Sequence, residues 1–146
     1  MKLLLSRFIN DPTHEYVSII NYHQQLPVEH SHDYFEFFVV NQGSAIHRAN
    51  GASQSLSKGT AVLMRPDDVH SYQHMSRDFE IINMLVPAPI MHAALDYLGQ
   101  GFESARLLES RVPVVSRLSS GDFETLKVEL EQLVLAQHAL LGRSDS

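Results

Sequence analysis

The strongest constraint on the fold is a succession of short β-forming stretches, separated by turn signals, between about residues 13 and 86. The clearest unit is a hairpin, in which residues 44–49 and 52–56 flank Asn50-Gly51. Asn-Gly is favoured in type I′ turns because both central residues need a positive φ. The other expected strands cover residues 16–20, 33–41, 60–64, 70–75 and 79–86. Many short strands with regular turns predict a mainly β sandwich or barrel.

The pattern changes after Pro87. Residues 90–98, followed by Gly99, are typical of a short helix with a glycine cap at its C-terminus. The Val-Pro-Val-Val sequence of residues 112–115 favours extended chain, because proline disfavours helix at the residue before it. A final helix is expected over residues 122–141, since serine and aspartate side chains around its start offer capping oxygens.

The expected final helix carries mostly apolar residues at alternating three- and four-residue steps. These positions are Phe123, Leu126, Leu130, Leu133, Gln137 and Leu140. Such a seam has two interpretations: an amphipathic helix packed on its own sheet, or a contact between two copies of the chain. We predict a homodimer through residues 122–141, with Leu126, Leu130, Leu133 and Leu140 forming the contact.

Composition limits the functions that this chain can perform by itself. Its 146 residues, 44% of them hydrophobic, suffice for one domain with a substantial core. The formal net charge is −6 and the 11 basic residues are scattered, so the chain lacks a phosphate-binding surface for DNA. The absence of cysteine excludes disulfides and thiolate ligands. Without a signal-peptide or transmembrane pattern, we expect a cytoplasmic protein that does not contact membranes.

Candidate metal ligands lie in the segment His-Ser-His-Asp-Tyr-Phe-Glu, residues 30–36. His30, His32 and Glu36 occupy even positions, which share one face of a β-strand, and the apolar residues around them indicate a buried strand. His70 is expected on a neighbouring strand. Three imidazoles and a carboxylate can bind one divalent transition metal, such as Zn, Ni, Fe or Mn. The alternative is a polar pocket without metal, in which the burial of Glu36 would be costly or would force it to take up a proton.

The same segment resembles the first signature motif of the cupin superfamily. That motif is His-x-His, three or four residues, Glu, six residues and Gly. His30, His32, Glu36 and Gly43 match it. Gln24 stands where the motif expects a glycine before its first histidine.

A second segment resembles the other cupin motif, in a degenerate form. Gly59 and His70 match its first glycine and its histidine. The positions of its Pro, second Gly and Asn are occupied by Arg65, Asp67 and His74. The resemblance therefore carries over all four metal ligands but not every turn residue.

Within the cupins, the two segments and the hairpin resemble the N-terminal sensing domain of AraC-family transcription regulators, and the chitobiose-operon regulators are the most similar subgroup. The resemblance covers about residues 10–140. It implies a single domain over residues 1–146. A cupin-type β-barrel (jelly roll) would occupy about residues 10–87, and a helical C-terminal part about residues 88–141.

This resemblance implies an effector-sensing and dimerisation domain rather than an enzyme. A small molecule, expected to be a sugar or a sugar phosphate, would bind inside a metal-containing barrel. DNA contact would come only from a helix-turn-helix region that this chain lacks. The alternative from a different class is a small metal-dependent cupin enzyme, such as a dioxygenase or a sugar isomerase.

Four further residues are candidates for effector binding. Tyr34 and Tyr72 offer ring faces and hydroxyls to a sugar, although both can simply fill the core. Arg65 can bind an anionic group or pair with a neighbouring aspartate, and His74 can line the mouth of the pocket or lie in an exposed loop. The other histidines share no spacing, and we predict ordinary surface or hydrogen-bonded side chains for His14, His23, His47, His92 and His138.

Overall fold

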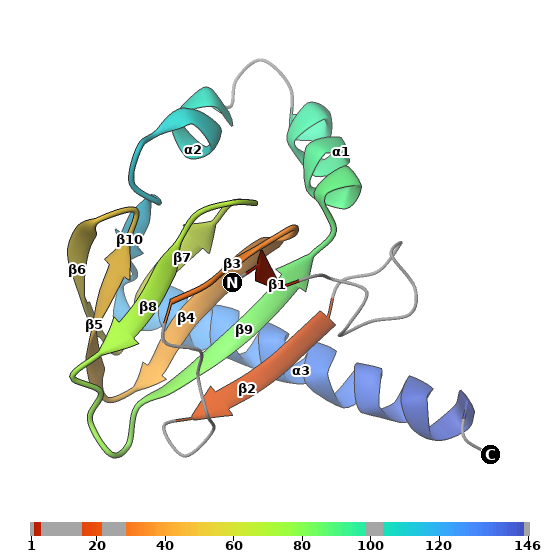
Figure 1. The fold of residues 1–146 in the computed structure, drawn as a ribbon. Coiled ribbons are helices and arrows are strands. Elements are labelled where there is room, and N and C mark those ends of the chain that lie inside the picture. Colours follow the sequence, from red (N-terminus) through yellow and green to blue (C-terminus); the bar gives the residue numbers. More distant parts are fainter. Residues whose placement is uncertain (1, 4–15, 22–28, 99–103, 145–146) are drawn as a thin grey trace.

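The computed structural model describes residues 2–3, 16–21, 29–98 and 104–144. Strands dominate up to Val86, and helices follow (Figure 1). The strands are β1 (Lys2–Leu3), β2 (Tyr16–Asn21), β3 (Ser31–His32), β4 (Phe35–Gln42), β5 (Ser44–Ala49), β6 (Ala52–Ser57), β7 (Thr60–Met64), β8 (His70–Gln73), β9 (Glu80–Val86) and β10 (Val115–Arg117). The helices are α1 (Ala88–Leu98), α2 (Ser104–Glu109) and α3 (Ser120–Ser144). The predicted mainly β class with C-terminal helices is confirmed.

The strands form two antiparallel sheets. One sheet has five strands in the order β10-β7-β4-β9-β2, and the other has three in the order β6-β5-β8. A short parallel pair, β1 and β3, adds to them. Helices α1 and α2 lie beyond one end of the sheets, and α3 runs across the outer face of the larger sheet (Figure 1).

The predicted hairpin is present between β5 and β6. Asn50 and Gly51 have φ values of 50° and 83°, as a type I′ turn requires. The other predicted strands are also present, with ends shifted by one or two residues. The short strands β1 and β10 and the helix α2 were not predicted; the six residues of α2 lack the periodic apolar pattern that marks a longer helix.

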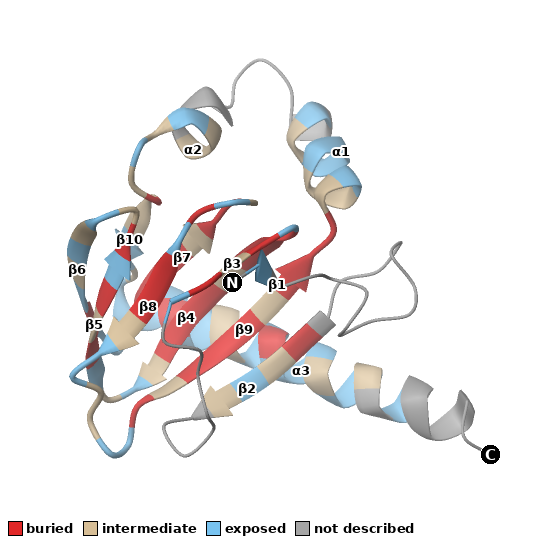
Figure 2. Cartoon of the chain, in the orientation of Figure 1, coloured by how far each residue is buried: buried red, intermediate tan, exposed pale blue. Residues whose placement is uncertain are grey.

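Two apolar layers hold the molecule together, one on each face of the larger sheet (Figure 2). The layer between the sheets contains Phe38, Met64 and Ile81. The layer beneath α3 contains Val39 and Ile82, their immediate neighbours in sequence. This alternation follows from the two-residue period of a strand, which sends successive side chains to opposite faces. Glu36 has the same parity as Phe38 and therefore faces the space between the sheets.

Helix α3 packs on its own sheet. Its first turn is capped by Ser119, whose hydroxyl accepts a hydrogen bond of 3.2 Å from the amide of Asp122. Leu130 is buried in the layer beneath the helix, and Leu126 packs against that layer. Leu130 therefore belongs to the core of one chain, which corrects its predicted place in a dimer contact, whereas for the half-buried Leu126 that contact stays a prediction. Leu133 is 40% exposed, and the side chain of Leu140 lies outside the described residues.

Gln137 of α3 binds the backbone of the edge strand β2. Its side-chain oxygen accepts a hydrogen bond of 2.9 Å from the amide of Val17, and its side-chain nitrogen donates one of 2.9 Å to the carbonyl of the same residue. This pair reproduces the bonds that an adjacent strand would make. Neither α3 nor any other helix in the described ranges has the length and hydropathy of a membrane-spanning segment.

Candidate metal and effector site

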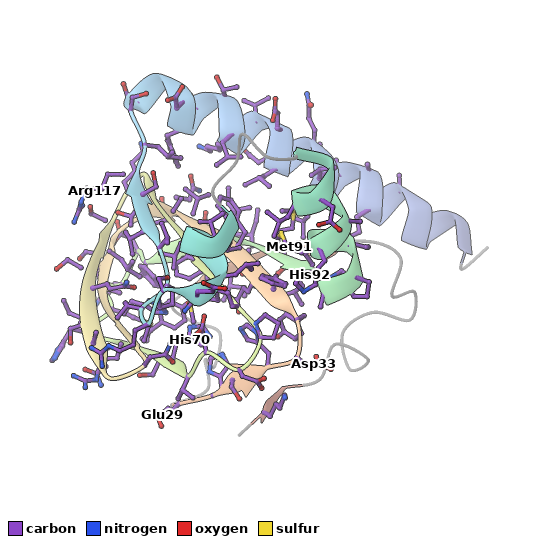
Figure 3. The ribbon with its side chains drawn as sticks, turned by 90° about the horizontal axis from the view of Figure 1, so that it is seen from above. Glu29, Asp33, His70, Met91, His92 and Arg117 are labelled. Atoms are coloured by element: carbon purple, nitrogen blue, oxygen red, sulfur yellow. The ribbon has the colours of Figure 1, made fainter. Side chains whose placement is uncertain are left out.

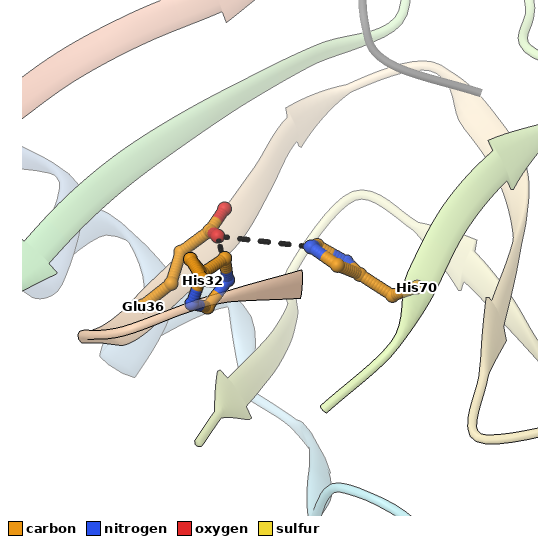
Figure 4. Close-up of side chains that lie close together, drawn as sticks. All are labelled: His32, Glu36 and His70. Carbon is orange, nitrogen blue, oxygen red and sulfur yellow. Dashed lines mark ion pairs between the residues drawn. The ribbon is translucent and has the colours of Figure 1, made fainter. Parts of the chain in front are cut away.

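Three predicted ligands converge in the space between the two sheets. His32 ends β3, Glu36 is on β4 and His70 begins β8 of the opposite sheet. One potential ligand atom from each of the three lies within 4.8 Å of the others (Figure 4). All three residues are buried.

His32 is oriented by the backbone. Its Nδ1 lies 2.8 Å from the carbonyl oxygen of Tyr34, so this nitrogen carries a proton and donates it. The ring also stacks on the ring of Tyr34, with centroids 4.2 Å apart and planes inclined by 8°. In the neutral tautomer, Nε2 then presents a lone pair to the Glu36 carboxylate at 2.8 Å. This short contact between Nε2 and the carboxylate is not a hydrogen bond, and Nε2 has no other hydrogen-bond partner.

His70 is oriented by another histidine. Its Nδ1 lies 2.8 Å from Nε2 of His47, while its own Nε2 lies 3.8 Å from Oε2 of Glu36 and has no hydrogen-bond partner. Burial, with smaller contributions from the neighbouring histidines, lowers the pKa of His70 to about 2. Burial also lowers the pKa of His47. Both rings are therefore neutral at physiological pH, and each keeps one lone pair.

His30 lies beside this group without joining it. Its backbone pairs with that of His70 through hydrogen bonds of 3.0 and 2.9 Å, and the two rings are 4.3 Å apart between centroids. Its buried Nδ1 has no hydrogen-bond partner, and burial lowers its pKa. We predicted that His30, His32 and Glu36 share one face of a single strand. The strand is interrupted instead, because the chain bends at residues 33–34 between β3 and β4.

Tyr72 adds a buried hydroxyl near the group. Its ring lies 5.7 Å from that of His70 and 5.3 Å from that of His47. Its hydroxyl has no hydrogen-bond partner, and burial together with the charge of Glu36 raises its pKa well above the usual value. Burial likewise raises the pKa of Tyr34, which is almost wholly enclosed.

Two other predicted contacts have different surroundings. All five donors of the Arg65 guanidinium are used: they bind both carboxylate oxygens of Asp68, the hydroxyl and carbonyl of Ser110, and the carbonyl of Leu107. Arg65 therefore anchors the C-terminal end of α2 and the residue that follows it, and has no donor left for a ligand. His74 lies exposed in the turn after β8, with a φ of 52°. Figure 3 contrasts His70, directed inward, with Arg117 at the surface.

Sequence reasoning missed two inward-facing polar residues. His47 is completely buried, between the buried Ala45 and Ala49 of β5. Asn83 is buried on β9, an inner strand of the larger sheet, with an unpartnered Oδ1. The burial of His47 could have been predicted, because it lies on the same face of the predicted hairpin strand as Ala45 and Ala49. Asn83 interrupts the apolar run of residues 81–85, which was also visible.

Comparison with known proteins identifies relatives of this chain. The family model for the AraC-like ligand binding domain matches residues 13–141. The transcriptional activator RhaS of Enterobacter sp. (strain 638), named as HTH-type, is 28% identical over 120 residues, which are 79% of this chain and 42% of the relative. RhaS of Mannheimia succiniciproducens is 31% identical over 85 residues, 58% of this chain and 31% of the relative. This chain thus spans less than half the length of these relatives.

A solved structure shows the same fold at low sequence identity. Apo ToxT K231A from Vibrio cholerae superposes with a TM-score of 0.60 and 11% identity, covering 81% of this chain and 47% of that one. Another ToxT structure, described as bound to an unsaturated fatty acid, gives a TM-score of 0.50 with 12% identity, covering 77% of this chain and 43% of that one. Because the family model covers most of the chain, this protein belongs to the AraC-like ligand-binding domain family of transcription regulators.

Proposed function

We propose that this domain senses a small-molecule effector between its two sheets, at a divalent metal held by His32, Glu36 and His70. The supporting observation is the convergence of three acceptor atoms. Two imidazole nitrogens without hydrogen-bond partners face one carboxylate oxygen, at 2.8 and 3.8 Å. Lone pairs repel one another and the carboxylate, whereas a cation among them would satisfy all three. The residues present therefore fit a metal ion.

The donor set narrows the choice of metal. Two imidazoles and one carboxylate suit divalent Fe, Zn, Ni, Co or Mn better than Mg or Ca, which prefer oxygen. His30 is the candidate for a fourth ligand, because its ring adjoins His70 and its Nδ1 is unpartnered. A bound metal would supply a Lewis acid with an open position for an effector oxygen. The chain's own residues would fix the positions of the ligands and exclude water around them.

The polar lining supports a carbohydrate as the effector class. The hydroxyl of Tyr72 and Oδ1 of Asn83 are buried without hydrogen-bond partners, so an incoming ligand can satisfy them. Sugar hydroxyls both donate and accept hydrogen bonds, and the Tyr72 ring offers an apolar surface. A fatty acid, as in the ToxT structure, would leave such polar atoms unpaired. The narrower resemblance to chitobiose-operon regulators stays a prediction.

We infer that DNA binding belongs to another part of the whole protein. The relatives are named as HTH-type activators, and this chain covers less than half of each. Its net charge of −6, with dispersed basic residues, is unsuited to phosphate contacts. In this proposal, effector binding changes how the domain meets a partner subunit or the DNA-binding region.

Elemental analysis of protein purified without chelator tests the metal. We expect near-stoichiometric divalent metal in wild type and none after combined His32→Ala and His70→Ala substitution, because Glu36, even with His30, leaves too few ligands to retain it. His92→Ala, an exposed histidine on α1, serves as the matched control and keeps the metal. Wild-type protein that stays metal-free after incubation with Zn, Ni, Mn and Fe would contradict the proposal.

A thermal-shift panel of mono- and disaccharides and their phosphates, run on metal-loaded protein, tests the effector class. A specific sugar raises the melting temperature by mass action, and fatty acids serve as the comparison. The same three-residue donor set occurs in non-haem iron oxygenases, which favours an enzyme as the second candidate. Oxygen uptake or sugar isomerisation well above a metal-free control would establish that alternative instead.

A further inference from the structure

A chain of hydrogen bonds leads from the candidate metal site to the segment before β10. His70 Nδ1 lies 2.8 Å from His47 Nε2, and His47 Nδ1 lies 3.0 Å from Oε1 of Gln54. Gln54 Nε2 in turn donates a hydrogen bond of 3.0 Å to the carbonyl of Pro113. The sheet register supports this chain, because His47 and Gln54 are direct cross-strand partners in the β5–β6 hairpin.

The carbonyl of Pro113, at the outer end of this series of hydrogen bonds, determines which atom donates and which accepts in each of them. The Pro113 carbonyl can only accept, so it requires the amide nitrogen of Gln54 and turns the amide oxygen toward His47. That oxygen requires a proton on His47 Nδ1, which leaves a lone pair on Nε2 of the neutral ring. The lone pair requires a proton on His70 Nδ1. The remaining lone pair of His70 is then on Nε2, which faces Glu36.

The opposite arrangement of protons is disfavoured by the same contacts. A proton on His70 Nε2 would require donation from His47 Nε2 to His70 Nδ1, and hence a lone pair on His47 Nδ1. Gln54 would then have to turn its nitrogen toward His47 and its oxygen against the Pro113 carbonyl. Rotation of the His47 ring is also hindered, because the residue is completely buried and its ring lies 5.4 Å from that of Phe38 and 5.3 Å from that of Tyr72.

We propose that His47 and Gln54 are positioning residues that fix the tautomer of His70, so that its Nε2 lone pair is held ready for the metal. This inference rests on the proposed metal site. It also means that a carbonyl in the segment leading to β10 and α3 determines which nitrogen of His70 is available. The tautomer of His32 is fixed locally instead, because the carbonyl that accepts its Nδ1 proton is only two residues away in sequence.

Nitrogen-15 NMR of histidine-labelled, metal-free wild type tests the tautomer directly. We expect Nδ1–H and unprotonated Nε2 for both His47 and His70. A His70 ring protonated on Nε2 instead would overturn the proposal. This measurement needs no substitution in the site, and it decides the tautomer even if the wild type binds no metal, a result that would sink the metal proposal separately.

Metal affinity of two variants tests the consequence. Gln54→Leu and His47→Phe should each weaken Co²⁺ and Zn²⁺ binding by about 10- to 100-fold, the usual effect of losing a partner of a metal-bound histidine. The visible absorption of bound Co²⁺ should change as well. His47→Gln, which keeps an acceptor near the Nε2 position, should restore part of the affinity. Gln73→Leu and His92→Phe, both at exposed positions, are the matched controls.

Unchanged affinity and an unchanged Co²⁺ spectrum in folded Gln54→Leu and His47→Phe would overturn the proposal. Circular dichroism establishes that the variants are folded. If His47→Phe does not fold, Gln54→Leu decides the matter, because Gln54 is only half buried and its substitution leaves the interior volume nearly unchanged.

Discussion

Gly43, between β4 and β5, is the residue where chain geometry leaves least freedom. It has a φ of 81°, in the left-handed region that favours glycine. A Cβ at this position would lie 2.5 Å from Oγ of Ser76 and 2.7 Å from the Cα of Phe79. Gly51 has a similar φ of 83°, but a Cβ there would meet nothing within 4 Å. Substitutions at Gly43 and Gly51 therefore distinguish the cost of a left-handed backbone from the cost of a steric clash with neighbouring atoms.

We expect Gly51→Ala to lower the free energy of unfolding by about 1–2 kcal/mol, the penalty for a left-handed non-glycine residue. Gly43→Ala should cost roughly 1–3 kcal/mol more, because the backbone of Phe79 would have to move. Urea denaturation of both variants measures the difference. Equal losses would show that the turn around Gly43 adapts without strain.

At this scale the sequence predicted the residues of the site better than their surroundings. His32, Glu36 and His70 could be found because their spacing places acceptors on facing strands. The pairing of His47 with Gln54 follows from the hairpin register, since the two are seven residues apart, but its contact with His70, 23 residues away, depends on how the strands pack. For Arg65, the pairing with a neighbouring aspartate could be predicted, but the carbonyls of Leu107 and Ser110 that take its other donors are more than forty residues away in sequence.

Helix α3 shows how one periodic pattern serves two interpretations. Phe123 and Leu130 are buried against the sheet, whereas Val128 and Leu135 are exposed on the opposite side. The sequence predicted the helix and its buried stripe, because the period of an amphipathic helix is visible locally. It could not identify the surface that the stripe meets, since a sheet of the same chain and a second copy bury leucines equally well. The homodimer stays a prediction.

Leu130→Ala should lower the free energy of unfolding by about 2–5 kcal/mol, because it removes a side chain that is only 3% exposed. Leu135→Ala, at a position 68% exposed, should change it by less than about 0.5 kcal/mol. Thermal or urea unfolding compares the two. A stability loss for Leu135→Ala that depends on protein concentration would instead place that residue in a contact between subunits.

For the molecule as a whole, the candidate site joins two sheets that have separate hydrogen-bond networks. Glu36 belongs to the five-stranded sheet and His70 to the three-stranded sheet. Several neutral histidines fill the space between them, and burial is the largest cause of the lowered pKa of His30, His47 and His70. The charge of Glu36 offsets part of this effect at His30 and His47.

Metal-free protein should therefore lose stability in mild acid. A histidine whose pKa is lower in the folded than in the unfolded chain contributes stability fully above about pH 6.5, and that contribution falls as the pH approaches the folded pKa. The loss is up to about 1.4 kcal/mol per pH unit for each such group. Urea denaturation with chelator at about pH 7.5 and pH 5 measures it. The slope should be shallower in His47→Gln and unchanged in His92→Gln; equal stability at both pH values would contradict the expectation.

The two hydrogen bonds between Gln137 and Val17 have a consequence for the behaviour of the protein at high concentration. β2 is an edge strand, and an open edge offers unpaired amides and carbonyls to a strand of another molecule. The amide of Gln137 occupies both backbone groups of Val17. A foreign strand would have to displace α3 before it could pair with Val17, so the helix that completes the core also blocks this position of the sheet edge.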